Sequence, residues 1–244
     1  MIDSTTTNDD VGAATLSIIS SANRFNRWMY DQIKPYIIDE VLEVGSGIGN
    51  LSRFLIEEGH QTTLSDYNLD YAKTLKCLYE FDDRVSEILT IDLQDPDFDQ
   101  TYMNYKEKFN SIVMLNVIEH LENDHDAIRN CRFLLKNSGN LIILAPSYQF
   151  LFCRLDKELG HFRRYTKSTL SHLLKKEKFK LVSKKHFNFL GIFGWLITGK
   201  LIAKNQIGKN EMSAFDKLVP IARIMDKIIF NKAGLSVVVI SKKI

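Results

Sequence analysis

Residues 41–50 read VLEVGSGIGN, and this stretch decides the fold. The run at 40–44 is typical of a short strand, three glycines follow, and a helix-length pattern covers 51–58. Glycines let the chain turn sharply and let a ligand approach the backbone. The helix behind them offers free N–H groups and partial positive charge. The segment predicts a strand, a ligand-binding turn and a helix, and the alternative is a tight turn that binds nothing.

The spacing of the glycines separates two kinds of ligand. A dinucleotide site requires G-x-G-x-x-G, with the pyrophosphate at the end of the helix. Here Gly45, Gly47 and Gly49 alternate, and Asn50 stands where the dinucleotide pattern has its third glycine. Glu43 precedes the turn, and its carboxylate disfavours a phosphate by like-charge repulsion. The turn therefore suits a cation or a positively charged amino group.

Outward from this turn, strand patterns alternate with helix patterns. Strands are expected at 40–44, 61–65, 85–91, 110–115, 140–145, 180–186 and 235–241, and helices at 15–37, 51–58, 70–79, 124–135 and 167–176, with a turn at 137–139. Such alternation is typical of βαβ units in a mostly parallel sheet. Two more helix patterns, the second amphipathic, lie between the last two strands and predict an insertion that covers one end of the fold.

The whole chain of 244 residues is expected to form a single domain, residues 1–244. Within it we expect an N-terminal helical cover at 1–39, a substrate-side loop at 147–166 and a helical cap at 187–234. The apolar run FNFLGIFGWLITG at 187–199 is too short to span a bilayer. It is interpreted as core, lid or an interfacial helix, and segment 187–204 as a possible peripheral membrane contact.

Composition excludes several classes of protein. With 45% hydrophobic and 25% charged residues, the chain is neither disordered nor collagen-like. A net charge of +2 predicts neither nucleic acid nor an acidic partner, although basic residues concentrate after residue 172. The three cysteines, Cys77, Cys131 and Cys153, have no metal-ligand spacing. We expect reduced thiols and, because the N-terminus lacks a basic signal-peptide region, a cytoplasmic protein.

Two further carboxylates end predicted strands. Asp66 follows the second strand, where a carboxylate can accept two hydrogen bonds from a ribose diol. Its alternative role is the N-cap of the helix that begins near Asn68. Asp92 follows the third strand and can accept from an adenine amino group while Leu93 packs on the ring, although a turn residue is an equal alternative. Carboxylates at successive strand ends surround one ligand at the carboxyl edge of the sheet.

These motifs, with Asn116-Val117-Ile118-Glu119-His120-Leu121 after the fourth strand, resemble class I S-adenosylmethionine-dependent methyltransferases. Similarity is greatest to the small-molecule type, the quinone-biosynthesis or type 11/12 group. The resemblance implies an α/β, Rossmann-like, doubly wound sheet of seven strands, mostly parallel with an antiparallel last strand. It also implies that S-adenosyl-L-methionine is the cofactor and S-adenosyl-L-homocysteine the product.

Cofactor-binding positions follow from the same resemblance. The glycine turn contacts the methionine part, the acidic residue after the second strand holds the ribose, and the Asp-Leu pair flanks adenine. The positions are Tyr30, Glu43, Gly45, Ser46, Gly47, Gly49, Asn50, Asp66, Tyr67, Asp92, Leu93, Asn116 and Val117. For Tyr30, packing in the core is an equal alternative.

One departure from the family bears on the substrate. Methyltransferases that act on exocyclic amines of DNA bases carry Asn/Asp-Pro-Pro-Tyr/Phe after the fourth strand, whereas this sequence has Asn116-Val117-Ile118-Glu119. Ala145-Pro146-Ser147-Tyr148 follows the fifth strand and is not that motif. We therefore expect no DNA substrate.

Candidate catalytic residues are His120, His161 and Tyr165, because a hydroxyl acceptor benefits from a base with a pKa near neutral. His120 is alternatively bonded to backbone at a helix start. The donors clustered at 156–166 suit an anionic or phenolic substrate. The expected substrate-binding residues are Tyr148, His161, Arg163, Arg164 and Tyr165. Alternatively, Asp156 forms a structural ion pair with one arginine, and Thr166 caps the next helix. No metal site is expected.

The function expected from these residues is methyl transfer from S-adenosylmethionine to a small or lipid-like acceptor, at oxygen or else at carbon or nitrogen. One alternative is a non-catalytic protein that binds S-adenosylmethionine or S-adenosylhomocysteine on the same fold. The other is a protein or RNA methyltransferase that uses its basic C-terminal third. The oligomeric state and the acceptor are not readable from the sequence.

Overall fold

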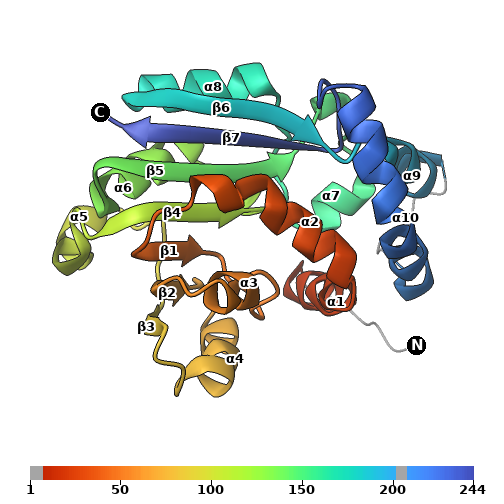
Figure 1. The fold of residues 1–244 in the computed structure, drawn as a ribbon. Coiled ribbons are helices and arrows are strands. Elements are labelled where there is room, and N and C mark those ends of the chain that lie inside the picture. Colours follow the sequence, from red (N-terminus) through yellow and green to blue (C-terminus); the bar gives the residue numbers. More distant parts are fainter. Residues whose placement is uncertain (1–7, 202–207) are drawn as a thin grey trace, which may run out of the picture.

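The computed structural model describes residues 8–201 and 208–244. One sheet of seven strands runs through the molecule in the order β3-β2-β1-β4-β5-β7-β6 (Figure 1). The strands are β1 (Val41–Val44), β2 (Thr62–Ser65), β3 (Val85–Leu89), β4 (Phe109–Leu115), β5 (Leu135–Pro146), β6 (Phe179–Phe187) and β7 (Ser236–Lys243). β7 is antiparallel to both of its neighbours, and the other pairs are parallel. The predicted mixed α/β sheet, with an antiparallel last strand, is confirmed.

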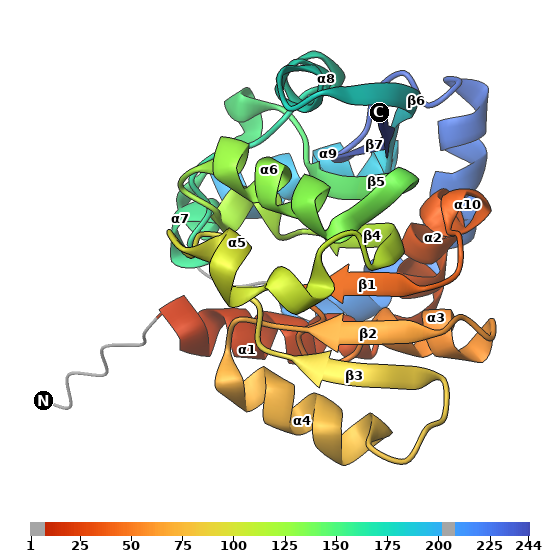
Figure 2. The same ribbon diagram turned by 90° about the vertical axis from the view of Figure 1, so that its left-hand side faces the viewer.

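Helices cover both faces of this sheet (Figures 1 and 2). They are α1 (Asn8–Ser20), α2 (Asn23–Ile33), α3 (Ser52–Glu57), α4 (Leu69–Tyr79), α5 (Phe98–Thr101), α6 (Asp124–Leu134), α7 (Arg154–Glu158), α8 (Lys167–Lys176), α9 (Phe189–Trp195) and α10 (Lys209–Ile228). One core packs α5, α6 and α8 on the sheet. The other packs α2, α3 and α10 on the opposite face. Burial on both faces explains why β4 and β5 are nearly continuous apolar runs.

The N-terminal helix pattern is interrupted. A single helix was expected over 15–37. Instead, α1 ends at Ser20, and Ala22, directly before α2, has a non-helical ψ of 71°. The Asn26 side-chain amide donates to the Ile19 carbonyl at 2.8 Å across the break. The expected helix was wrong here because no glycine or proline marks the break.

The strand β5 begins with an irregular segment. Leu135 pairs with Phe109, but the next pair is Asn140 with Ser111, so the register shifts over residues 136–139. Ser138 has a φ of 64° within this segment. The turn expected at 137–139 is thus a bulge inside a longer strand. The short helix α5 was not expected.

The insertion before β7 contains the two expected helices. α9 continues into a π-turn (Leu196–Leu201), and α10 packs on α2. The carboxylate of Asp226, buried in α10, accepts from the backbone N–H groups of Asn188 and Phe189 at 2.6 and 2.8 Å. These bonds fix the start of α9. Residues 202–204 of the expected membrane-contact segment lie outside the described residues.

Within residues 8–201 and 208–244, no helix is long and apolar enough to cross a membrane. The three cysteines are free thiols.

Candidate functional site

The glycine turn lies where the strand order reverses, between β1 and β4. Val44, the last residue of β1, pairs with Ser65 on one side and with Met114 on the other. The turn that starts at Gly45 therefore lies beside the ends of β2 and β4. The φ values of Gly45, Gly47 and Gly49 are +71°, +55° and +83°. Such carboxyl-end crevices at a switch point are where open α/β sheets bind ligands.

Gly45 is required for steric reasons as well as for its φ. A Cβ atom at this position would lie 2.3 Å from Cγ2 of Val117. The segment after β4, which includes η3 (Ile118–His120), therefore approaches the glycine backbone as closely as the chain allows. Residues with side chains at this turn would push the two segments apart.

Glu43 places a carboxyl group under the turn. It is 4% exposed, and the Ser52 hydroxyl donates to its Oε2. Burial raises the pKa of Glu43 to about 7. Hydrogen bonds from the Ser52 and Ser46 side chains lower this pKa, and the neighbouring Asp66 charge raises it. A positively charged group beside Glu43 would favour its ionised form.

Asp66 connects the glycine turn to the end of β2. Its Oδ2 accepts from the Gly47 N–H at 2.8 Å, and its Oδ1 accepts from the Asn68 N–H at 2.9 Å. Burial raises the pKa of Asp66, although these backbone hydrogen bonds act in the opposite direction. The N-cap of α4 is Asn68, whose side chain accepts from Asp70, so Asp66 does not have the capping role. Ser46 completes the connection, because its N–H donates to the Ser65 carbonyl at 2.9 Å.

Four other predicted cofactor residues lie along the same edge with different exposures. Asp92 is exposed, and its Oδ1 accepts from the Gln94 N–H at 2.8 Å, so it also serves as a turn residue. Leu93 is 3% exposed and already enclosed in the core with α6. Tyr67 is 67% exposed. Asn116 is exposed with a φ of 54° directly after β4.

Two predicted cofactor residues have other partners. Tyr30 is fully buried, and its ring stacks on Phe54 at 5.5 Å between centroids. This packing is that of the core alternative, and the cofactor role of Tyr30 stays a prediction. The Asn50 side chain donates to the Leu16 carbonyl at 3.0 Å, and Leu16 Cδ1 lies 3.2 Å from the Cβ position of Gly47. Asn50 therefore holds α1 over the glycine turn.

The second predicted cluster centres on the buried carboxylate of Asp156. Its Oδ1 is 2.8 Å from His161 Nδ1 and 2.8 Å from Arg164 Nε. Burial alone would raise the pKa of Asp156, but the His161 bond and the Arg164 charge outweigh it and lower the pKa. The Arg164 guanidinium lies 4.4 Å from the ring of Trp195, which brings the insertion onto this cluster. Asp156 and Arg164 form the structural ion pair that was the alternative interpretation.

Both candidate histidines meet at η3. The rings of His120 and His161 are perpendicular, with centroids 4.6 Å apart. The Phe162 N–H donates to the Glu119 carbonyl at 2.8 Å, which holds the 156–162 loop against η3. Desolvation lowers the pKa of His120 to about 3, and the neighbouring His161 lowers it further. Burial raises the pKa of Glu119 to about 7. Sequence reasoning missed Glu119, because only the loop contact brings it to His161.

The remaining predicted substrate residues contact side chains other than the two histidines. The buried Tyr165 hydroxyl donates to Asp124 Oδ2 at 2.8 Å, and Arg163 forms an ion pair with the same oxygen at 3.0 Å. Tyr148 stacks on His186 with centroids 4.9 Å apart. Arg163 and Tyr165 line a separate hollow of about 250 Å³ beside α8. The geometry thus joins His120 with His161 and leaves Tyr165 and Tyr148 outside this pair.

Comparison with known proteins identifies the family and the fold. The model of the methyltransferase-domain family matches residues 17–184. No similar sequence is found among curated proteins. A SAM-dependent methyltransferase from Archaeoglobus fulgidus has a TM-score of 0.59 and 15% identity, over 91% of this chain and 94% of that one.

Two more solved structures share the fold. Phosphoethanolamine N-methyltransferase 2 of Haemonchus contortus, in complex with S-adenosyl-L-methionine, has a TM-score of 0.62 and 17% identity, over 99% of this chain and 58% of that one. The other is geranyl diphosphate C-methyltransferase of Streptomyces coelicolor, solved with Mg²⁺, geranyl diphosphate and S-adenosyl-L-homocysteine. It has a TM-score of 0.63 and 10% identity, over 94% of this chain and 84% of that one. The chain therefore belongs to the methyltransferase-domain family, with the class I fold of the S-adenosylmethionine-dependent enzymes.

Proposed function

We propose that this protein transfers the methyl group of S-adenosylmethionine to a hydroxyl oxygen of a small or lipid-like acceptor. The observation that carries the proposal is the glycine turn at the switch point, flanked by the buried carboxylates of Glu43 and Asp66. The cofactor supplies an activated methyl on a sulfonium, so the protein mainly positions the acceptor and excludes water.

The residues present fit this cofactor. Gly45, Gly47 and Gly49 all have positive φ and carry no side chain, so the turn would let a ligand approach its backbone. The Asp66 carboxylate accepts from the Gly47 and Asn68 N–H groups and would also accept from a ribose diol. Glu43 would attract the positive amino group, and Asp92 would accept from adenine. Ser46, Gly47 and Gly49 shape the turn between them.

His161 is the better candidate for the base. Its Nδ1 faces the Asp156 carboxylate at 2.8 Å, which fixes the tautomer and leaves Nε2 as the acceptor of a proton. His120 has a pKa of about 3 and is a weak base at neutral pH. Of the predicted set, Arg163 and Tyr165 are engaged with Asp124, and we propose no catalytic role for Tyr165.

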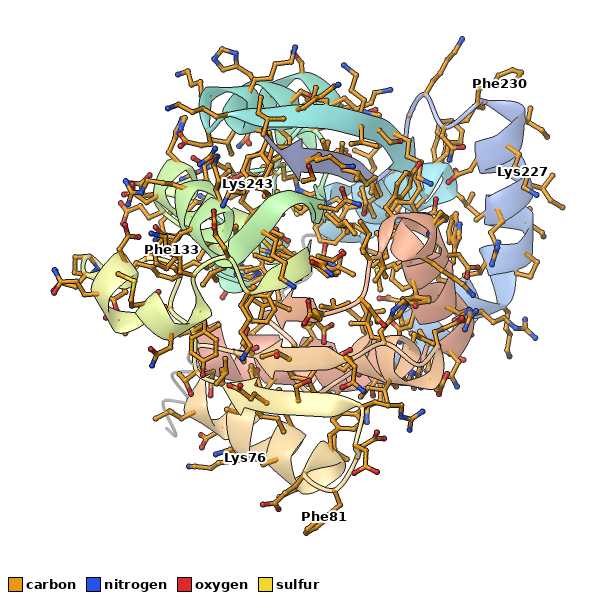
Figure 3. The ribbon with its side chains drawn as sticks, turned by 60° about the vertical axis from the view of Figure 1, so that its left-hand side comes forward. Lys76, Phe81, Phe133, Lys227, Phe230 and Lys243 are labelled. Carbon is orange, nitrogen blue, oxygen red and sulfur yellow. The ribbon has the colours of Figure 1, made fainter. Side chains whose placement is uncertain are left out.

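A lipid-like acceptor is supported by the surface of the insertion. α9, the π-turn and α10 expose Phe193, Ile197, Leu218, Ile221, Ile224 and Ile228. Lys227 lies on the outer side of α10, and Phe230 lies just beyond its end (Figure 3). Apolar side chains interleaved with lysines are typical of surfaces that contact anionic membranes. We therefore include peripheral contact with a membrane in the proposal.

The test begins with thermal unfolding of the full chain with S-adenosylmethionine, S-adenosylhomocysteine or NAD(H). At about 100 times the dissociation constant a ligand stabilises by roughly 2.7 kcal/mol. Stabilisation by the two sulfur compounds alone is expected, and stabilisation by NAD(H) alone would overturn the proposal. Release of S-adenosylhomocysteine in an acceptor screen by mass spectrometry then separates an enzyme from a non-catalytic binder. Transfer to protein or RNA instead would contradict the small acceptor.

A further inference from the structure

Three side chains at the end of β4 present metal-binding atoms to one point. One ligand atom from each of Glu119, His120 and His161 lies within 4.8 Å of the others. Spacing along the sequence predicted no metal site, because His161 is remote from the other two in the chain. The backbone bond from Phe162 to Glu119 brings them together.

Glu119 is the unusual member of this group. It is 1% exposed, and neither carboxylate oxygen has a hydrogen-bond partner on another described residue. A buried carboxylate without partners is costly, and such groups are normally paired or bound to metals. The charges of His161 and Arg164 favour its ionised form, and the His161 imidazole is also a potential metal ligand.

His161 is already oriented by its other nitrogen. Its Nδ1 is 2.8 Å from Asp156 Oδ1, and Asp156 is itself held by Arg164. Metal-ligating histidines almost always donate their second ring N–H to a carboxylate or a backbone carbonyl, which fixes the tautomer and the direction of the lone pair. His161 meets this condition, and the His120 ring lies beside it with centroids 4.6 Å apart.

We propose that Glu119, His120 and His161 bind one divalent transition-metal ion. Two imidazoles and one carboxylate form the donor set of catalytic zinc and of open Fe(II) sites, and imidazole disfavours Mg²⁺ and Ca²⁺. Ligand bonds of about 2.0–2.2 Å require donor atoms no more than roughly 4.4 Å apart, so small side-chain rotations close the site. Three protein ligands leave at least one position for another oxygen.

The role of this ion rests on the proposed function. An acceptor hydroxyl at the open position would have its pKa lowered by the cation. Its proton passes to solvent water, and the oxygen keeps the electron pair that forms the bond to the methyl carbon. The pair of the broken carbon–sulfur bond stays on sulfur. The cation then replaces His161 as the group that activates the acceptor.

Binding is tested on the full chain after treatment with a chelator and desalting. Titration with Co²⁺ is followed by its visible absorption and with Zn²⁺ by calorimetry, and each is expected to bind one ion per chain. Glu119→Gln, His120→Gln and His161→Gln should each weaken binding by at least about 10-fold. His125→Gln is the matched control, because His125 also pairs with a carboxylate, Glu177 at 2.9 Å, on another part of the surface. It should bind as the wild type does.

The outcomes separate this site from the proposed function. Absence of stoichiometric Co²⁺ and Zn²⁺ binding, or binding that survives both Glu119→Gln and His161→Gln, would overturn the site. Circular dichroism checks that each variant is folded, and Glu119→Gln is the safest because its carboxylate has no partner to lose. If metal binds but methyl transfer is unchanged in chelator, the activating role is wrong. If metal binds and S-adenosylmethionine does not, the proposed function fails while the site stands.

Discussion

At the scale of single residues, Asp66 serves two segments at once. It accepts from the backbone of Gly47 and of Asn68, which connects the glycine turn to the start of α4. The same carboxylate is the candidate ligand of a ribose diol. Substitution of Asp66 therefore tests both the link between the glycine turn and α4 and the binding of the ribose.

Asp66→Ala is expected to weaken S-adenosylhomocysteine binding by about 1–3 kcal/mol, because hydrogen bonds to the ribose are lost. Isothermal titration of the folded variant measures this. Asp70→Ala is the control, because Asp70 is exposed and pairs with Lys73 at 2.9 Å on the surface of α4. Equal affinities of Asp66→Ala and wild type would remove Asp66 from the site.

Glu43 makes the stability of the ligand-free protein depend on pH. Burial raises its pKa from 4.5 to about 7, so the folded state holds a proton that the unfolded state has lost. The stability that this group contributes is therefore complete below about pH 4.5 and declines as the pH rises toward 7. Glu43→Gln removes this pH-dependent loss of stability. Above about pH 7 it should stabilise the ligand-free protein by roughly 1–3 kcal/mol.

The measurement is urea unfolding of wild type and Glu43→Gln on both sides of this pH range. The difference between the two proteins isolates Glu43, since other titrating groups such as Glu119 are common to both. Glu43→Gln should also bind S-adenosylmethionine more weakly, because the amino group loses its counter-charge. A pH-independent difference in stability would show that Glu43 is ionised in the folded state.

At the scale of elements, the contact between the glycine turn and the segment after β4 sets the width of the site. Gly45→Ala would place a methyl group 2.3 Å from Val117 in a backbone with a φ of +71°. Gly59→Ala is a matched control, because Gly59 has a φ of +86° and open space around it. The control should cost about 1–2 kcal/mol from the backbone alone, and Gly45→Ala about 1–3 kcal/mol more.

Adding Val117→Ala to Gly45→Ala should recover most of that excess. Denaturant unfolding of the two single variants and the double variant gives the coupling energy. Additive effects would mean that the two segments do not meet as described.

The elements show which features the sequence could predict. β1 and β4 were placed correctly because glycines follow one and the other is a continuous apolar run. The break after Ser20 was missed because no glycine or proline marks it, and a side-chain bond from Asn26 to Ile19 spans it. The bulge at 136–139 was missed because it is a feature of the pairing with β4. In the site, the glycine turn and Asp66 lie within one local pattern. Glu119 was overlooked because its importance depends on the loop that carries His161.

At the scale of the whole molecule, the exposed apolar face of the insertion lies far from the end of the sheet that carries β3 and α4 (Figures 1 and 3). Figure 3 places Phe230, beyond α10, and Phe81, after α4, at different ends. Both are strongly exposed, at 79% and 93%. Before Phe230, α10 exposes Leu218, Ile221, Ile224 and Ile228, a longer apolar face than that of α4, which exposes Leu69 and Leu78 before Phe81.

Sedimentation with anionic vesicles is expected to capture the protein, less so at high salt because the lysine attraction is screened. Ile221→Ser with Ile224→Ser should lower the captured fraction at least about 10-fold, because burial of one such side chain contributes about 1.5–3 kcal/mol. Phe81→Ser serves as the control and should have no effect. Equal capture of both variants would remove the insertion face from the proposal.

The position of β7 has a consequence for the synthesis of the protein. β7 lies between β5 and β6, and within residues 8–201 and 208–244 it is the only strand that pairs with β6. While a ribosome is still translating residues 188–235, at about 5–20 residues per second, β6 therefore has no strand to pair with. The finished part of the sheet meanwhile keeps an open apolar edge at β5. Closure waits for residues 236–243, and until then that edge is exposed to chaperones and to neighbouring nascent chains.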